Sequence, residues 1–323
     1  MIRVKVHLDD QCRPHEPVSP DQFGDVIAAN RHGLLWIDLV EPTPEDFALL
    51  AAEFGFHPLA LEDAAKRHQR PKIDEYDGYL FVTFYRLDLD GDATRPIEID
   101  LFVGPNFLVT IRNDESPEIE TTSDRWCRNS EQLGKRGVGF LLYSLLDAIV
   151  DGYFPALDRM TDEFEALEER IFEHYDVHVQ RDIFILRRQL IALRRVLAPE
   201  RDIMNVLVRR DTPVLGDDAT VYFQDVYDHI LRVTDALDGF RDLLSSALDA
   251  SLSANSNRLN QVMRTLTASS IVLMSMTLVA SVYGMNFVHM PELDWLFGYA
   301  WAIGLMMTIG VTLFMLFRRI KWF

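Results

Sequence analysis

The chain has 323 residues, and its 50 aspartates and glutamates outnumber its 32 lysines and arginines, which gives a formal net charge of −18. This charge argues against nucleic acid as a partner, because phosphates attract a basic surface, and against a surface drawn to anionic lipid. A cation partner fits the balance better. The length allows about two domains in addition to any membrane segment.

The N-terminal portion, which we expect to form a cytosolic domain over residues 1–138, has the pattern of an α/β domain. Alternating or apolar runs predict strands at residues 2–8, 34–40, 79–89, 96–104 and 106–112. Thr43, followed by Pro44 and Asp46, predicts the start of a helix that runs to about Phe54. Another helix should begin near Pro58. We expect a mixed or antiparallel sheet flanked by helices.

Strand patterns disappear after about residue 139, and helical spacing of apolar residues takes their place. We predict a cytosolic helical hairpin over residues 139–215, with a mild interruption at Pro155. Its second helix should cover residues 179–208 and be bounded either by Pro199 or by Pro213.

A long helix is expected next, within a segment that we place at residues 216–283. Between residues 222 and 283 there is no proline and a single glycine, Gly239. Unbroken, this stretch would be a helix of about 62 residues, roughly 90 Å long at 1.5 Å per residue. Apolar residues recur along it at spacings of three and four: Val226, Ile230, Val233, Leu237, Phe240, Leu244, Leu248 and Leu252. We therefore expect a stalk helix that rises from the cytosolic domain.

Two uncharged runs near the C-terminus are long enough to cross a membrane. No charged side chain occurs between Arg264 and Glu292, and none occurs in residues 296–317. A hydrocarbon core of about 30 Å requires roughly 20 apolar residues. The loop at residues 284–295 contains no Lys or Arg, whereas the tail at residues 318–323 is basic.

Because positive residues stay on the cytoplasmic side, the loop should face outward and both termini should be cytoplasmic. The chain is thus predicted to be a multi-pass protein of the inner or plasma membrane. The alternative is a pair of helices buried in a soluble core.

Small polar and thioether side chains share one face of the first predicted span. At 100° per residue this face contains Asn260, Met263, Thr267, Ser270, Met274, Thr277 and Ser281. None of these side chains is charged, so a cation that meets them would not be held by carboxylates. The stripe suits a pore lining or a close helix interface, and ordinary packing through small residues is the alternative.

Short motifs around the two spans carry a resemblance to a known family. YGMN at residues 283–286 is followed by MPEL at residues 290–293, a second span and a basic tail that ends in KWF. This arrangement resembles the CorA family of magnesium transporters, and the segments at residues 57–81 and 222–230 resemble that family as well. The resemblance implies a homopentameric funnel with a central pore lined by the first span.

The resemblance also implies roles for individual residues in conduction. Gly284, Met285 and Asn286 would form the outer selectivity filter, in which a ring of amide carbonyls accepts hydrogen bonds from a hydrated ion. Magnesium suits such a ring because it gives up its waters reluctantly. Gly284 would let the backbone turn into the mouth, and Glu292 would lie in the external loop.

Several positions of the first span match pore-lining residues of the family, namely Asn260, Met263, Leu266, Met274 and Thr277. Met263, Leu266 and Met274 would form a hydrophobic constriction that closes by dewetting. Ser281 occupies a position at which the family often has glycine.

Regulation by intracellular magnesium is a further implication of the resemblance. Asp225 matches one sensor carboxylate, and its partner would be Asp88 or Asp90, between which the sequence does not choose. Bound cations would screen like charges across an interface between copies and hold the pore closed. When magnesium falls, repulsion would loosen the ring.

These observations predict a channel that admits Mg2+, with Co2+ or Ni2+ as further cargo, down its electrochemical gradient and without an ATP site. The expected partners are other copies of the chain, the lipid bilayer and divalent cations; no enzyme activity, nucleic acid or organic cofactor is expected. One alternative is a zinc transporter of the same fold, similar to the ZntB group, with or without proton coupling. Another is a scaffold that the two spans only anchor to the membrane.

Overall fold

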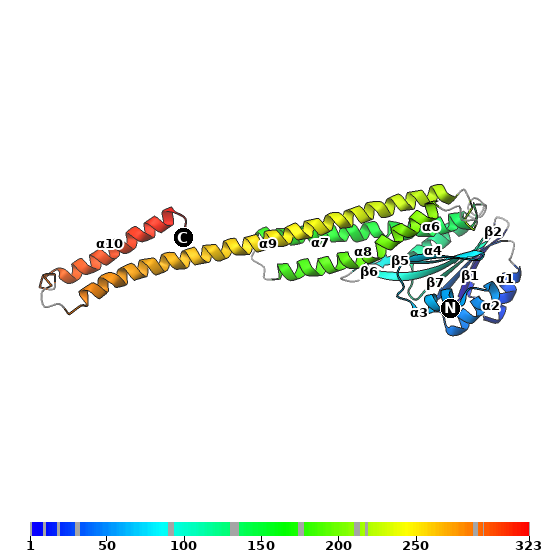
Figure 1. Ribbon diagram of the computed structural model, residues 1–323, viewed down its shortest axis with the longest axis horizontal. Coiled ribbons are helices and arrows are strands. Elements are labelled where there is room, and N and C mark those ends of the chain that lie inside the picture. The colour runs from blue at the N-terminus through cyan, green and yellow to red at the C-terminus, as the bar shows by residue number, and fades with distance from the viewer. Residues whose placement is uncertain are drawn as a thin grey trace. The chain divides into compact units, whose positions relative to one another are not determined.

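The computed structural model describes residues 2–8, 11–17, 20–29, 33–89, 94–129, 136–173, 178–209, 214–216, 219–286, 290–292 and 294–322. The chain divides into two compact units (Figure 1). One unit is made of Met1–Arg170 and Val177–Ser245, and the other of Ile171–Asp176 and Ser246–Phe323. The domain boundaries predicted from the sequence stay predictions.

The first unit is built on a seven-stranded mixed sheet with the order β2-β1-β3-β7-β6-β5-β4. Neighbouring strands are antiparallel except β3 and β7, which are parallel. The strands are β1 (Ile2–Leu8), β2 (Gln11–Pro17), β3 (Leu34–Val40), β4 (Lys72–Tyr76), β5 (Tyr79–Asp88), β6 (Arg95–Val103) and β7 (Phe107–Arg112). The prediction of an α/β domain is confirmed, and the sheet is mixed.

Helices cover both faces of the sheet. Along the described chain they are α1 (Pro20–Ala29), α2 (Pro44–Phe54), α3 (Pro58–Lys66), α4 (Pro117–Arg128), α6 (Gly137–Asp151), α7 (Tyr153–Glu173), α8 (Val179–Arg209), α9 (Thr220–Tyr283) and α10 (Gly298–Arg319). Because side chains alternate along a strand, the strands contribute side chains to two cores, one on each face of the sheet. Phe81 and Phe102 pack with α1, α2 and α3. Val82 and Leu101 share the larger core with α4, α6, α7, α8 and α9.

Local signals read from the sequence are confirmed where they involve caps and apolar periodicity. Thr43 and Asp46 form a reciprocal capping box at the start of α2. The predicted seam of α9 is buried in the first unit at Val226, Ile230 and Val233. The pattern did not identify β2, β4, α1 or α4.

The predicted position of the helix interruption near Pro155 is wrong, because the break between α6 and α7 lies at Gly152. Pro155 lies in the first turn of α7, where backbone N–H groups have no partner inside the helix and the missing donor costs little. Pro199 lies inside α8, which continues to Arg209. Pro199, one of the two boundaries predicted for this helix, therefore does not end it.

Three described helical stretches are long and apolar enough to cross a membrane: Gly137–Ile171, which comprises α6 and most of α7, Thr220–Tyr283 and Gly298–Arg319. The apolar window of the first is 56% buried within the protein, against 6% and 11% for the other two. Leu145 and Ile149 in this first stretch are fully buried in the core of the sheet domain. It is thus a core element, and α9 and α10 supply the two spans that the sequence predicted.

In the second unit, the C-terminal part of α9 packs against α10. Ala268 is fully buried, and Thr265 donates a hydrogen bond from Oγ1 to the carbonyl oxygen of Trp322 at 3.1 Å. A Cβ placed on Gly310 would lie 3.4 Å from Sδ of Met276. Small residues at the contact let two apolar helices approach closely. This contact defines which face of α9 is left for other partners.

A buried carboxyl joins strand β5 to helices α7 and α8. Oε1 of Glu200 accepts the backbone N–H of Tyr85 at 2.8 Å, and Oε2 lies 2.8 Å from the hydroxyl of Tyr153. That hydroxyl also lies 2.5 Å from the carbonyl oxygen of Tyr85. Because a hydroxyl has one proton, it donates to the carbonyl and accepts the proton of a neutral Glu200. Burial accordingly raises the pKa of Glu200 well above its usual range.

Glu200→Gln should preserve this arrangement and remove its pH dependence. The amide can accept from Tyr85 and donate to Tyr153, so the fold should be retained. In the unmodified protein the pKa of Glu200 is raised on folding, so the stability it contributes is complete below the unfolded pKa and is lost as pH rises toward the folded value. Between pH 5 and 8 in detergent, the free energy of unfolding should therefore decrease less steeply with pH for the variant than for the unmodified protein. The two slopes should differ by up to about 1.4 kcal/mol per pH unit, as thermal unfolding measures.

Glu168→Gln, at an exposed position of α7, is the matched control and should leave the slope unchanged. An unaltered pH slope in Glu200→Gln would show that the buried carboxyl does not titrate in this interval.

Candidate functional site

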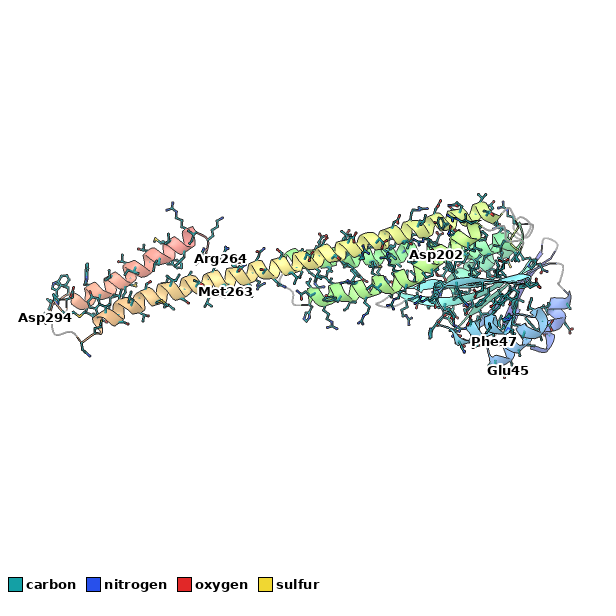
Figure 2. All side chains as sticks on the ribbon, in the orientation of Figure 1. Glu45, Phe47, Asp202, Met263, Arg264 and Asp294 are labelled. Atoms are coloured by element: carbon teal, nitrogen blue, oxygen red, sulfur yellow. The ribbon has the colours of Figure 1, made fainter. Side chains whose placement is uncertain are left out.

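The uncharged polar stripe predicted on the first span forms a row along one side of α9. We call this set the polar row; all its members are exposed in the structure: Asn260, Met263, Thr267, Ser270, Met274, Thr277 and Ser281. Met263 and Met274 are 53% and 70% exposed, and Figure 2 marks Met263 on this helix. Leu266, which was also predicted to line a pore, is 59% exposed.

The side of α9 opposite the polar row is the one that α10 covers. At 100° per residue the midpoints of the two rows lie about 180° apart. The covered side consists of buried or half-buried residues: Thr265, Ala268, Ser269, Val272, Met276 and Val279. The structure therefore separates a helix-packing face from a polar face that a single chain leaves without a partner helix.

This separation has a consequence in a membrane. The side chain of Thr277 donates its hydroxyl hydrogen to the carbonyl oxygen of Leu273 at 2.9 Å, but the side chains of Asn260, Ser270 and Ser281 make no hydrogen bond to another described residue. Polar side chains in hydrocarbon are costly unless they meet protein or water. The row fits a surface that faces water or further copies of the helix.

The YGMN motif follows directly on the end of α9. The backbone N–H of Gly284 lies 3.0 Å from the carbonyl oxygen of Ala280, and that of Met285 lies 3.3 Å from the carbonyl oxygen of Val282, so the last turn is capped by backbone bonds. Asn286 comes next, is exposed, and forms no hydrogen bond to another described residue. Its amide is thus free to face a ligand at the end of the helix.

The role predicted for Gly284, a turn of the backbone into a pore mouth, stays a prediction. Gly284 does not adopt the left-handed conformation that glycine alone tolerates easily. A Cβ at this position would meet only Ala280 O at 3.4 Å and Ser281 O at 3.6 Å, which are ordinary contacts. The turn of this chain alone therefore does not require glycine.

The loop between the spans is described only in part. Glu292 is exposed, as expected of a residue in an external loop, and its carbonyl oxygen would lie 2.0 Å from a Cβ on Gly298. Glycine at the first position of α10 therefore lets this loop pass close to the helix. Leu293 of the MPEL motif lies outside the described residues.

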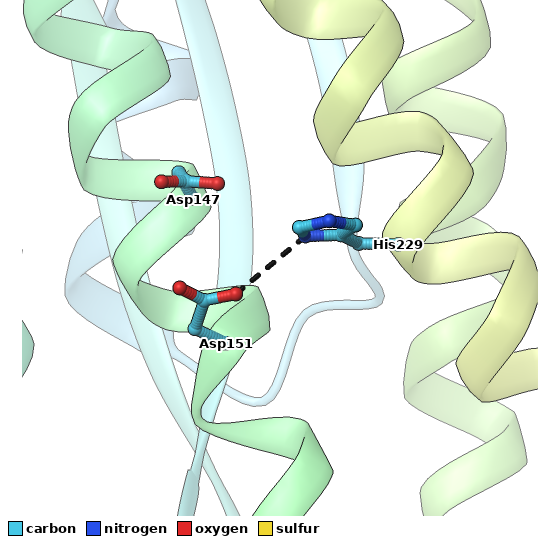
Figure 3. A group of neighbouring side chains, drawn as sticks. All are labelled: Asp147, Asp151 and His229. Carbon is cyan, nitrogen blue, oxygen red and sulfur yellow. Dashed lines mark ion pairs between the residues drawn. The ribbon is translucent and has the colours of Figure 1, made fainter.

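A group of ionisable side chains lies in the first unit between α6 and α9 (Figure 3). One ligand atom from each of Asp147, Asp151 and His229 lies within 4.8 Å of the others. Nδ1 of His229 is 3.5 Å from Oδ1 of Asp151. This nitrogen is buried and makes no hydrogen bond to another described residue. A cation placed among the three would be within reach of Nδ1 and of both carboxylates.

The electrostatics of this group favour a bound cation. Burial raises the pKa of Asp147, and the neighbouring carboxylate of Asp151, one turn away on α6, raises it further. Asp225 acts on Asp147 in the same direction. Carboxylate oxygens suit Mg2+, and the addition of an imidazole nitrogen also suits Co2+, Ni2+ or Zn2+.

The predicted regulatory carboxylates are found in different settings. Oδ1 of Asp225 lies 3.9 Å from Nε2 of His229, so Asp225 adjoins the group formed with Asp147 and Asp151. Asp88, at the end of β5, forms an ion pair of 2.7 Å with Arg95. Asp90 lies outside the described residues. A pairing of Asp225 with Asp88 or Asp90 stays a prediction.

The sequence analysis missed Asp147, Asp151 and His229. A signal was present, because the two acids are four residues apart within the otherwise apolar stretch SLLDAIVD and therefore share one face of α6. His229 likewise follows Asp225 at a spacing of four on α9. Their meeting across two helices far apart in the sequence could not be read from either spacing.

Replacement of Asp147 by Asn should stabilise the metal-free protein and weaken its response to cations. The change removes a carboxylate that is partly desolvated and repelled by Asp151, so the melting temperature in chelator should rise by about 2–4 °C if the gain is near 1 kcal/mol. The increase in melting temperature on addition of Mg2+ or Co2+ should shrink, because one ligand is lost.

Asp162→Asn on the exposed surface of α7 should change neither quantity. A full metal-induced shift in Asp147→Asn would exclude this carboxylate as a ligand.

Comparison with known proteins relates this geometry to a family. A model of the CorA-like Mg2+ transporter protein family matches residues 31–319. The chain is 37% identical over 289 residues to the YfjQ protein of Bacillus subtilis (strain 168), a match that covers 89% of each chain. It is 33% identical over 290 residues to the cobalt/magnesium transport protein CorA of Thermotoga maritima, which covers 89% of this chain and 83% of that protein.

A solved structure extends the likeness to the whole chain. The complete structure of the CorA magnesium transporter from Methanocaldococcus jannaschii superposes with a TM-score of 0.85 at 26% sequence identity. The match covers 100% of this chain and 99% of that one. The sheet domain, the long helix and the C-terminal pair of helices thus recur together in that transporter.

Proposed function

We propose that this chain, which belongs to the CorA-like family of divalent metal ion transporters, forms a channel through which Mg2+ enters the cell. Family membership makes the chain a membrane protein with C-terminal transmembrane helices, and a transporter rather than an enzyme. The choice of ion, the direction of transport and the assembly of several copies are parts of the proposal.

The observation that carries the proposal is the position of the polar row on the side of α9 opposite α10. Several copies of α9, each with α10 on its outer side, can arrange these rows around a common axis. Water and ions then meet the hydroxyl, amide and thioether groups, and α10 separates them from lipid. A homopentamer, as the resemblance to the family implies, would be such an arrangement.

Selection of the ion is assigned to Asn286, with Gly284 and Met285 beside it. In the assembly, an amide from each copy would ring the mouth of the pore. Amide carbonyls accept hydrogen bonds from the water shell that Mg2+ retains. Because these groups are uncharged, they can orient the hydrated ion without binding it too tightly for release. The thioethers of Met263 and Met274, together with Leu266, provide an apolar constriction that a pore can close by dewetting.

The membrane potential is the proposed driving force. An inside-negative potential contributes about 2.3 kcal/mol per charge per 100 mV, and about twice that for a divalent ion. Entry of Mg2+ is therefore favourable without coupling to ATP hydrolysis.

Regulation is assigned to the carboxylates of the first unit. Asp225 lies on the same helix as the polar row and next to Asp147, Asp151 and His229. Intracellular Mg2+ bound at this group would neutralise repulsion among its carboxylates. Loss of the cation would restore repulsion and favour movement of α9 relative to α6. Asp88 or Asp90 of a neighbouring copy is the predicted partner carboxylate of Asp225.

Asn286→Ala should abolish uptake of Mg2+ by vesicles that contain the purified protein under an inside-negative potential. The reason is that the amide is the group proposed to receive the hydrated ion. Fluorescent detection of Mg2+ inside the vesicles would measure the effect, with a loss of at least about tenfold expected for removal of a selectivity ring.

Asn257→Ala provides a matched control, because Asn257 is an exposed amide on α9 that lies off the polar row. Uptake that survives Asn286→Ala would contradict the proposed filter. Failure of the unmodified protein to pass any divalent ion would instead favour a membrane-anchored scaffold.

Asp225→Ala should make transport less sensitive to Mg2+ inside the vesicles. Uptake is measured at increasing internal Mg2+, and the concentration that halves the rate should rise by roughly tenfold if about 1.4 kcal/mol of cation binding is lost. Asp249→Ala, an exposed acid further along α9, should leave the inhibition curve in place. Coincident curves for Asp225→Ala and the unmodified protein would argue against this sensor.

Competition among metals distinguishes the proposed cargo from zinc. Uptake of Mg2+ should be reduced by Co2+ and Ni2+ and should not require a pH gradient. Zinc uptake that exceeds Mg2+ uptake and depends on a proton gradient would support the zinc transporter alternative.

A further inference from the structure

One face of α8 presents arginines and large apolar side chains to solvent. We call it the arginine row; its members follow one another at spacings of three and four, and all are exposed: Arg181, Phe184, Arg188, Ile191 and Arg195. Phe184 and Ile191 are 55% and 44% exposed. Spacing of this kind places the five side chains on one side of the helix. Arginine and aromatic side chains are enriched at protein interfaces.

The preceding helix, α7, presents the opposite charge in the same way. Its exposed acidic row consists of Asp158, Asp162, Glu165 and Glu169, again at spacings of three and four. At 1.5 Å per residue the acidic row is about 16 Å long and the arginine row about 21 Å long. The two rows are therefore opposite in charge and similar in length.

Neither row is satisfied by the residues that the structure describes. Each lies opposite the buried row of its own helix, which includes Met160, Phe164 and Leu167 on α7 and Leu186, Leu190 and Leu193 on α8. None of the charged members forms an ion pair with another residue that the structure describes. The ion pairs that do hold this part of the unit together use other residues, such as Arg170 with Asp182 at 2.8 Å and Arg194 with Asp238 at 2.9 Å.

We propose that the arginine row of one chain docks against the acidic row of a second copy of the same chain. The contact is heterologous, because each copy offers both rows and uses them toward different neighbours. Repetition of such a contact closes into a ring when the rotation between copies allows it. The inference rests on the self-assembly that the proposed function requires, and it assigns α7 and α8 to the contact between copies.

Charge complementarity favours a second copy over other occupants. The chain as a whole carries a formal charge of −18, so two copies repel unless they meet through surfaces of opposite sign. The arginine row supplies the positive surface, and the acidic row supplies its counterpart on the same unit. The exposed apolar side chains between the arginines add surface that docking removes from water.

Disulfide trapping in the full-length protein, reconstituted in vesicles, tests the contact. Glu165→Cys combined with Arg188→Cys places one thiol in each row. Oxidation should give a ladder of covalent multimers, visible in denaturing gels. Glu165→Cys combined with Arg187→Cys is the matched control, because Arg187 is exposed on α8 but rotated by about 100° from Arg188. Each single-cysteine variant accounts for background from the native cysteines.

Charge reversal then tests the electrostatic basis of the contact. Each reversal is made in the protein with the two introduced cysteines. The arginine reversal, Arg181→Glu with Arg195→Glu, should lower the multimer yield on the order of tenfold. The acidic reversal, Asp158→Lys with Asp162→Lys and Glu169→Lys, should have an effect of the same size. The two reversals together restore complementarity and should return the yield to within about threefold of the original. Raising the salt to 1 M should also lower the yield, because the screening length falls to about 3 Å.

The outcomes separate this inference from the proposed function. Uptake of Mg2+ without a ladder above the control would reject the contact and leave the channel intact. A ladder that is indifferent to both reversals, or a double reversal that fails to rescue, would also reject it. The arginine reversal could instead reduce binding to vesicles of anionic lipid and leave trapping unchanged. This result would show that the arginine row faces lipid, and it would reject the contact between copies. Absence of uptake by the unmodified protein would count against the proposed function itself.

Discussion

The hydrocarbon interior of a membrane offers no hydrogen bonds, and this constraint governs how α9 can be used. The helix has a face of small and apolar residues, Thr265 and Ser269 among them, that α10 covers, and an opposite face with an amide, hydroxyls and thioethers that α10 leaves exposed. A single pair of helices would leave the polar face toward lipid. In the proposed assembly, several copies would resolve this conflict, and the same assembly would create a path for an ion.

The proposed sensing group and the proposed pore lining lie on one secondary-structure element. His229 and Asp225 occupy the part of α9 that belongs to the sheet domain, and the polar row occupies the part that belongs to the second unit. Asp147 and Asp151 meet His229 from α6. A cation bound at this group would therefore act on the same helix that would line the pore, and its binding energy would favour one position of that helix over another.

The buried polar network around Glu200 fixes the position of the α6 end that carries Asp151. Tyr153 begins α7 two residues after Asp151 ends α6, and its hydroxyl is held by Glu200 and by the backbone of Tyr85. The break between the two helices is thereby tied to strand β5. Hydrogen bonds inside a dry core have strict geometry, so the end of α6 that carries Asp151 is held in place.

Long apolar periodicity, uncharged runs and turn chemistry are properties of the chain itself, so the sequence alone determined the two spans, the extent of α9, most strands and the capping box of α2. The short or polar elements β2, β4, α1 and α4 have no such signature, because contacts with the sheet stabilise them. Only the tertiary structure decided which side of α9 is left to the polar row, since this depends on where α10 packs. It alone also brought Asp147 and Asp151 to His229, about 80 residues away, because proximity between distant helices follows from packing of the common core and not from any local pattern.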